Sequence, residues 1–190
     1  MREKQGRHFG VISILNHWCS AIVFLSLLAL GFFLEFTGDG RGTGGPLMGL
    51  HKSVGVLFLG FACWRLGWRL LQGFPKDVAS MPWIQEVAAK LVHWALLTAT
   101  IVMPVSGILM SIYGNRSINV FGLFTVPAMP ENEYINRIAD GVHWAVAYLV
   151  ALAVLMHVGG VLKHHLLDRD ETLKRMIKPL KSASQPEKPS

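Results

Sequence analysis

Four long apolar segments dominate this chain of 190 residues, and they constrain its fold more than any other feature. A helix that spans a bilayer needs about 20 mostly apolar residues, so each segment is long enough to cross a membrane. We predict helices over residues 12–36, 47–71, 87–113 and 138–166. Hydrophobic residues make up 52% of the chain and charged residues only 16%, which excludes an ordinary soluble domain. The predicted fold class is all-α, an integral membrane four-helix bundle.

We expect one membrane domain over residues 1–176, because the four helices and their connections use up nearly the whole chain. The first apolar segment has full spanning length and lacks a small-residue cleavage site, so we interpret it as a retained helix. The segment 177–190 is rich in Ser, Pro and Lys and is expected to be a disordered cytoplasmic tail.

The distribution of the 18 Lys and Arg residues predicts the orientation of the bundle. Most of them lie in the first ten residues, in the second connection with its flanking helix ends, and in the tail from Lys163. The first and third connections hold only Arg41, Lys52, Arg116 and Arg137. Cytoplasmic loops are enriched in Lys and Arg, so both termini are expected in the cytoplasm and these two connections outside. The net charge of +6 then reflects topology and lipid contact, and we expect no nucleic-acid partner.

Histidines within the predicted helices are the most informative polar residues, because an ionisable group at membrane depth is costly without a partner or a purpose. His143 and His157 are 14 residues apart, so they share one face of the fourth helix at depths about 21 Å apart. The predicted topology places His51 level with His143 near the outer surface, and His17 level with His157 near the inner surface.

Paired neutral imidazoles are strong axial ligands for haem iron, and bis-histidine ligation suits electron transfer because it leaves no open position for a substrate. A single buried histidine is more often a hydrogen-bonded core residue, but two pairs matched in depth are harder to obtain by chance. His93 enters the third helix from the inner side and competes with His17 for His157, and geometry from sequence leaves that choice open. Neither Cys19 nor Cys63 lies in a C-x-x-C-H motif, so any haem must be held non-covalently.

Several short motifs resemble those of one family. They are Asn16-His17-Trp18, Leu50-His51-Lys52-Ser53-Val54-Gly55, Pro104-Val105-Ser106-Gly107, Phe121-Gly122-Leu123-Phe124 and the segment from Leu162 to Asp170. From about Arg7 to Met176 the chain resembles the bacterial cytochrome b561 family and, more distantly, the cytochrome b subunits of nickel-iron hydrogenases and formate dehydrogenases. The resemblance implies a four-helix bundle in the bacterial inner membrane with two haems b on His17, His51, His143 and His157. It also implies ubiquinone as electron acceptor or donor.

Two functions remain open at this point. The first is a self-contained oxidoreductase that takes electrons on the outer side, as the superoxide oxidase branch of the family does from superoxide, and passes them to quinone. Lys52, Arg41, Arg116 and Arg137 are the cations expected to attract an anionic donor, although they would equally neutralise haem propionates. The second is a relay or anchor subunit that docks a partner dehydrogenase or soluble cytochrome, with the connection Gly114 to Arg137 as docking surface or lid.

On the inner side, the candidates for a quinone and proton-uptake region are His93, His164, Arg65 and Arg69, where ionisable imidazoles and cations collect. For His93 the resemblance implies a role beside the inner haem or in the quinone site. His164 is equally compatible with a plain position among the lipid headgroups.

Overall fold

A computed structural model describes residues 10–38, 45–72, 82–170 and 172–177. Its helices are α1 (Val11–Thr37), α2 (Pro46–Gln72), α3 (Trp83–Ile112), α4 (Glu133–Lys163) and the short α5 (Thr172–Arg175). A π-helical turn, η1 (His164–Asp168), continues α4, and the strands β1 (Ile118–Val120) and β2 (Phe124–Val126) form a hairpin between α3 and α4.

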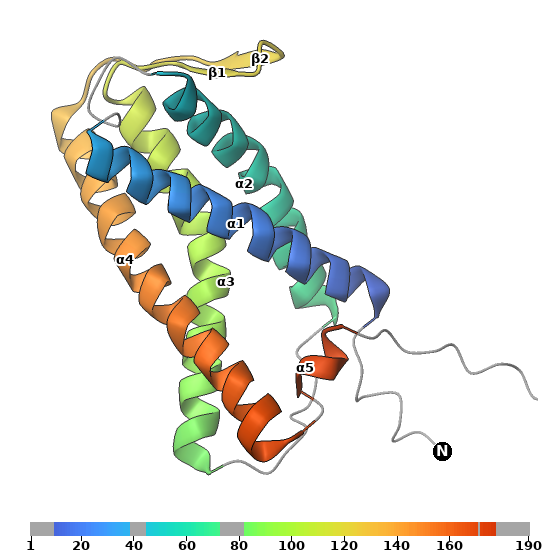
Figure 1. Ribbon diagram of the computed structural model, residues 1–190. Helices are drawn as coiled ribbons and strands as arrows, with labels where there is room; N and C mark the ends of the chain where they lie inside the picture. The colour runs from blue at the N-terminus through green and yellow to red at the C-terminus, as the bar shows by residue number, and fades with distance from the viewer. Residues whose placement is uncertain (1–9, 39–44, 73–81, 171, 178–190) are drawn as a thin grey trace, which may run out of the picture.

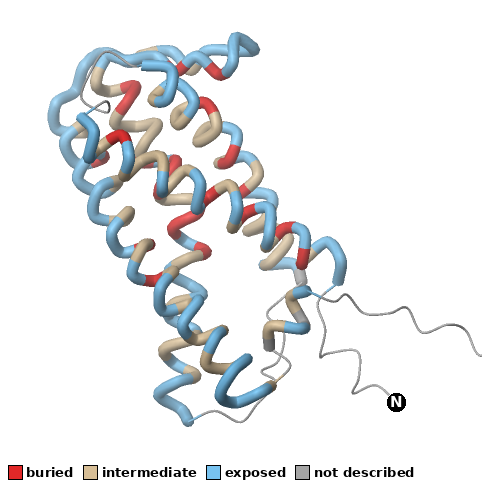
Figure 2. The backbone as a smooth tube through the Cα atoms, viewed as in Figure 1, coloured by how far each residue is buried: buried red, intermediate tan, exposed pale blue. Residues whose placement is uncertain are grey.

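Four of these helices are long and apolar enough to cross a membrane: Val11–Thr37, Pro46–Leu71, Trp83–Ile112 and Glu133–Asp168. The predicted all-α membrane bundle of four helices is therefore confirmed. Large apolar side chains such as Ile22 and Leu149 remain exposed. Figure 2 shows that most of the length of the four long helices is exposed or intermediate, as expected for surfaces that face lipid. The predicted disordered tail lies outside the described residues from residue 178 onward.

Two helices begin about one turn earlier than their apolar segments suggest. The third starts at Trp83 rather than at residue 87, directly after Pro82, which holds an extended backbone conformation at the N-cap. The fourth starts at Glu133 rather than at residue 138, because the side chain of Asn132 accepts a hydrogen bond from the Ile135 backbone N–H. Both added turns are partly polar, so an apolar pattern alone does not include them.

The helices are arranged so that the hairpin lies at one end of the bundle, while the start of α1 and the short α5 lie at the other (Figure 1). We call these the hairpin end and the terminal end. The indole N–H of Trp18 on α1 donates to the Met176 carbonyl at 2.8 Å, which attaches the segment after α5 to α1. By the charge argument above, the hairpin end is the predicted outer end.

The middle of the bundle is apolar. Phe24, Phe58, Ala62, Ala99, Met103 and Val150 form its buried cluster, with contributions from all four long helices. The rings of Phe24 and Phe58 are stacked with centroids 5.6 Å apart. This cluster lies between the depths at which the two predicted histidine pairs occur, so it separates them with packed side chains.

Candidate functional site

His51 and His143 come together near the hairpin end. His51 lies in the second turn of α2 and His143 in the third turn of α4, and their ring centroids are 6.3 Å apart with an interplanar angle of 79°. Two imidazoles that bind one metal from opposite sides, each through a bond of about 2 Å, place their ring centres about 6 Å apart. The observed separation therefore matches that of a metal-bridged pair.

The His143 ring is oriented by the turn of α3 that contains Pro104. Its Nδ1 lies 3.0 Å from the Met103 carbonyl oxygen and 3.1 Å from the Ser106 hydroxyl, which itself donates to the same carbonyl. A carbonyl oxygen only accepts hydrogen bonds, so Nδ1 must carry the proton. The neutral ring then presents the lone pair of Nε2, which is the form required of a metal ligand.

Glycines allow both rings of this pair to approach the neighbouring helices. A Cβ atom on Gly107 of α3 would lie 3.1 Å from His143 Cε1, and one on Gly31 of α1 would lie 3.3 Å from His51 Cε1. Among the described residues, Nδ1 of His51 is buried and has no hydrogen-bond partner. A buried nitrogen left without a protein partner is unusual and suits a ring whose position is determined by a bound group.

A second histidine cluster lies near the terminal end. The rings of His17 on α1 and His157 on α4 have centroids 6.3 Å apart, the same separation as in the first pair. His93 on α3 lies nearer to His157, with centroids 5.4 Å apart, which is short for two rings with a metal between them. His17 also contacts Trp18 edge-to-face, at 5.5 Å between centroids.

The residues at both levels fit haem. Each pair offers imidazole ligands on different helices at a spacing that accepts an iron atom, and an apolar cluster of the bundle lies between the two pairs. His143 and His157 are separated by 14 residues of continuous helix, so the two levels are about 21 Å apart along α4.

The predicted cations at the hairpin end are only partly gathered. The Lys52 ammonium donates to the Ser111 hydroxyl at 3.1 Å. Lys52 also interacts electrostatically with Arg116 and with the His51 ring. Arg137 forms an ion pair with Glu133 one turn earlier in α4. Arg41 lies outside the described residues.

At the terminal end, Arg65 and Arg69 interact electrostatically with the His17 ring, and Arg65 interacts in the same way with the His157 ring. These two arginines and His93, all from the predicted quinone region, are therefore near the pair His17–His157. His164 has a different environment.

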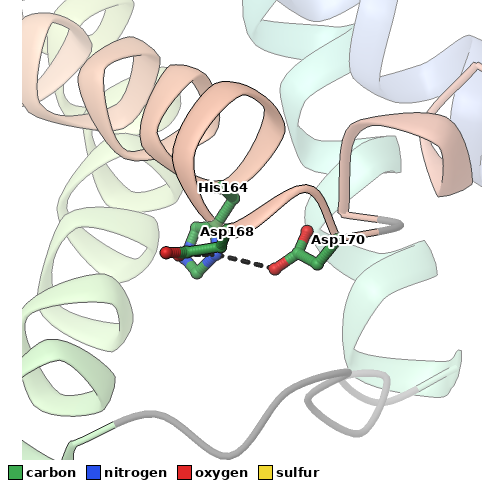
Figure 3. Close-up of side chains that lie close together, drawn as sticks. All are labelled: His164, Asp168 and Asp170. Carbon is green, nitrogen blue, oxygen red and sulfur yellow. Dashed lines mark hydrogen bonds and ion pairs between the residues drawn. The ribbon is translucent and has the colours of Figure 1, made fainter.

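His164 takes part in a cluster of polar contacts with Asp168 and Asp170 at the end of α4 (Figure 3). Its Nδ1 lies 2.8 Å from an Asp170 oxygen and 3.0 Å from an Asp168 oxygen, and Lys163 contacts the same Asp168 oxygen at 2.6 Å. Arg169 adopts the left-handed conformation, and the Asp170 N–H donates to the His164 carbonyl. One histidine and two carboxylates at this spacing could hold a metal ion. Here Lys163 and His164 already contact the two carboxylates, so we interpret the cluster as stabilising the C-terminal end of the helix.

The roles of four residues at the site were not expected from the sequence. They are the Met103 carbonyl and Ser106 on His143, Gly31 beside His51, and Ser111 beneath Lys52. The motif Pro104-Val105-Ser106-Gly107 contains Ser106 and Gly107, which both contact His143, but the motif alone does not indicate which histidine it contacts.

Taken together, a membrane bundle of four helices with paired histidines at two depths is the architecture of a membrane-bound b-type cytochrome. Comparison with known proteins agrees, because the model of the prokaryotic cytochrome b561 family matches residues 8–179. The chain belongs to this family: it is a multi-pass protein of the bacterial inner membrane that uses haem b for electron transfer.

Individual relatives are similar over almost their whole length. Cytochrome b561 homolog 2 of Escherichia coli K12 is 34% identical over 170 residues, which cover 89% of this chain and 90% of that protein. Cytochrome b561 homolog 1 of the same organism is 25% identical, with 89% and 96% covered. A Yersinia pestis protein described as a probable superoxide oxidase, CybB, is 24% identical, with 90% and 96% covered.

Proposed function

We propose that this protein carries electrons across the membrane through two haems b, from a donor on the outer side to the quinone pool. His51 and His143 hold the outer haem, and His17 and His157 hold the inner one. The observation that carries the proposal is the common separation of 6.3 Å between the ring centroids of both pairs. Haem iron, when bound by two histidines, supplies reversible one-electron chemistry without an open coordination position.

Within the inner cluster, distance favours His17 over His93 as the ligand that pairs with His157. The His93 ring, at 5.4 Å between centroids, is too close to His157 for an iron atom to lie between them in the usual geometry. His93 then lies beside the inner haem, in contact with the ring of one of its ligands, together with Arg65 and Arg69.

The outer end suits an anionic electron donor, and superoxide is the donor that we propose. Lys52 is adjacent to the outer ligand His51 and is held by Ser111, and Arg116 adds a second positive charge nearby. Cations around an entry point raise the local concentration of a small anion. The similarity to a protein described as a probable superoxide oxidase supports the same donor.

The salt dependence of the reaction tests this donor. Lys52→Gln and Arg116→Gln should each slow haem reduction by superoxide about 2- to 10-fold at low salt and flatten its dependence on ionic strength, because screening weakens attraction between exposed charges. The measurement is stopped-flow reduction of the purified protein at low and high salt. Arg137→Gln is the matched control, since Arg137 is already paired with Glu133. Rates indifferent to salt and to both substitutions would argue for a neutral donor.

The inner end is the proposed quinone side. Reduction of one quinone takes up two electrons and two protons, and two superoxide anions that lose one electron each become dioxygen, so the overall reaction balances. The charges of Arg65 and Arg69 interact with the His17 ring, and the His93 ring lies against that of His157. These three residues are proposed to bind the quinone oxygens and to assist proton uptake. His164 is the weaker candidate, because Asp168 and Asp170 already engage its ring.

Activity of the isolated protein tests the function as a whole. Purified protein in lipid nanodiscs with ubiquinone should convert superoxide to dioxygen and quinone to quinol in a ratio of two to one, without another protein. Arg69→Gln should lower quinol formation while leaving the rate of haem reduction by superoxide unchanged. If the haems are reduced but no quinol forms, the alternative of a relay subunit that needs a partner dehydrogenase or soluble cytochrome is favoured.

A further inference from the structure

The hairpin between α3 and α4 ends in a rigid turn. β1 and β2 pair antiparallel, with Val120 opposite Phe124, and the turn between them holds Phe121 and Gly122 in left-handed conformations, with φ of 52° and 74°. The Gly122 N–H donates to the Asn119 side-chain oxygen at 2.6 Å. The tip therefore presents its side chains in a defined arrangement.

The side chains at this tip are large, apolar and exposed. Leu123 is 77% exposed, Phe121 53% and Phe124 48%, although the strand residues Ile118 and Val120 behind them are buried. The whole stretch from Ser117 to Pro130 contains no Asp, Glu, Lys, Arg or His. A hairpin tip in water would normally carry polar residues, so this composition calls for an apolar surrounding.

The level of the hairpin indicates what that surrounding is. The Ser53 hydroxyl on α2 donates to the Asn119 carbonyl at 2.8 Å. Ser53 lies seven residues after Pro46, the first residue of α2, so β1 contacts this membrane-spanning helix roughly 10 Å along its length rather than beyond its end. In Figure 1 the hairpin runs across the end of the bundle and its turn projects sideways past α2.

We propose that the hairpin tip, formed by Phe121, Leu123 and Phe124, inserts into the lipid headgroup region of the leaflet at the hairpin end. β1 packs on α2 about two turns inside the start of that helix, so a tip that projects sideways from this position meets lipid rather than water. Aromatic side chains favour this zone, where apolar and polar surroundings meet. The occupant of this surface is therefore the bilayer itself, not a docked redox protein, and the inference does not depend on which donor or quinone the protein uses.

Photo-crosslinking identifies what the tip contacts. Leu123→Cys is introduced in a chain with Cys19→Ser and Cys63→Ser, and the thiol is coupled to a benzophenone that reacts with nearby C–H bonds. The protein, checked by its haem spectrum, is irradiated in nanodiscs of phosphatidylethanolamine and phosphatidylglycerol. The matched control is Glu131→Cys, an exposed position on the same connection that follows the uncharged stretch.

Lipid adducts should form at position 123 at least about tenfold more than at position 131, a factor comparable to moving one leucine-sized side chain from water into an apolar phase. A charged maleimide should also alkylate the thiol introduced at position 123 more slowly than the thiol introduced at position 131 in nanodiscs, and the difference should disappear after denaturation. Equal lipid adducts at both positions would overturn the proposal, as would crosslinks from position 123 mainly to a second copy of the chain.

Discussion

The His143 ring shows how single residues position a ligand of the proposed outer haem. Gly107 leaves room for the ring and the Met103 carbonyl fixes its proton on Nδ1. Gly107→Ala would place a Cβ 3.1 Å from Cε1 and 3.4 Å from Nδ1 of His143, so the ring must shift. We expect one haem to bind more weakly, at a cost of about 1–3 kcal/mol from overpacking, seen as a haem content between one and two per chain.

Gly60→Ala is the control for this substitution, because a Cβ at Gly60 in α2 meets nothing within 4 Å. It should leave the haem content and absorbance spectrum unchanged. If Gly107→Ala also leaves both unchanged, the close packing of Gly107 on His143 does not position the ligand.

At this scale the family resemblance decided between His17 and His93 as the partner of His157. From helix period and alternating direction, which determine depth, the sequence was sufficient to propose only the pair His51–His143 and the depth of the second cluster. It was insufficient for the groups that orient them. The hydrogen bond from His143 to the Met103 carbonyl joins residues 40 positions apart, and it depends on how α3 and α4 pack. No periodic pattern within either helix encodes that contact.

Among the structural elements, the connection that follows α3 packs tightly against the start of α4 around Gly114. A Cβ on Gly114 would lie 2.7 Å from Asn136 Nδ2 and 2.9 Å from the Met110 carbonyl oxygen, and these two atoms are hydrogen-bonded to each other at 2.5 Å. Gly114→Ala must therefore break or distort this bond. It should lower the free energy of unfolding by about 1–3 kcal/mol.

Thermal unfolding in detergent, followed by circular dichroism, measures this effect. The comparison is Gly49→Ala in the first turn of α2, where a Cβ meets nothing within 4 Å. Alanine has the higher helix propensity, so Gly49→Ala should be neutral or slightly stabilising. A melting temperature for Gly114→Ala equal to that of the unsubstituted protein would show that the junction relaxes around the methyl group.

The elements also show where prediction from sequence stops. The four helices follow from the length of the apolar segments, but Asn132 and Pro82 set two of their starts within polar surroundings. The hairpin was expected only as a long connection, because its strands have three residues each and Phe121 adopts a positive φ that its residue type does not suggest. Its buried strand residues are recognisable only once α2 is placed beside them.

For the whole molecule, the uneven distribution of Lys and Arg predicts that both termini face the cytoplasm. Green fluorescent protein fused to the C-terminus should therefore be fluorescent in cells, and alkaline phosphatase fused at the same point should be inactive. The reverse result would show that the bundle has the opposite orientation in the membrane. The proposed donor side, with Lys52 and Arg116, would then face the cytoplasm.

The central claim is that two haems are bound at two depths by the pairs His51–His143 and His17–His157. The most direct measurement is the ratio of haem to protein, with reduced-minus-oxidised spectra, for the purified protein and its histidine variants. The account predicts two haems per chain for the unsubstituted protein and for His93→Ala, and one for His51→Ala and His17→Ala, with a different haem retained in each. A ratio of one in the unsubstituted protein would contradict it, as would loss of a haem in His93→Ala with both retained in His17→Ala.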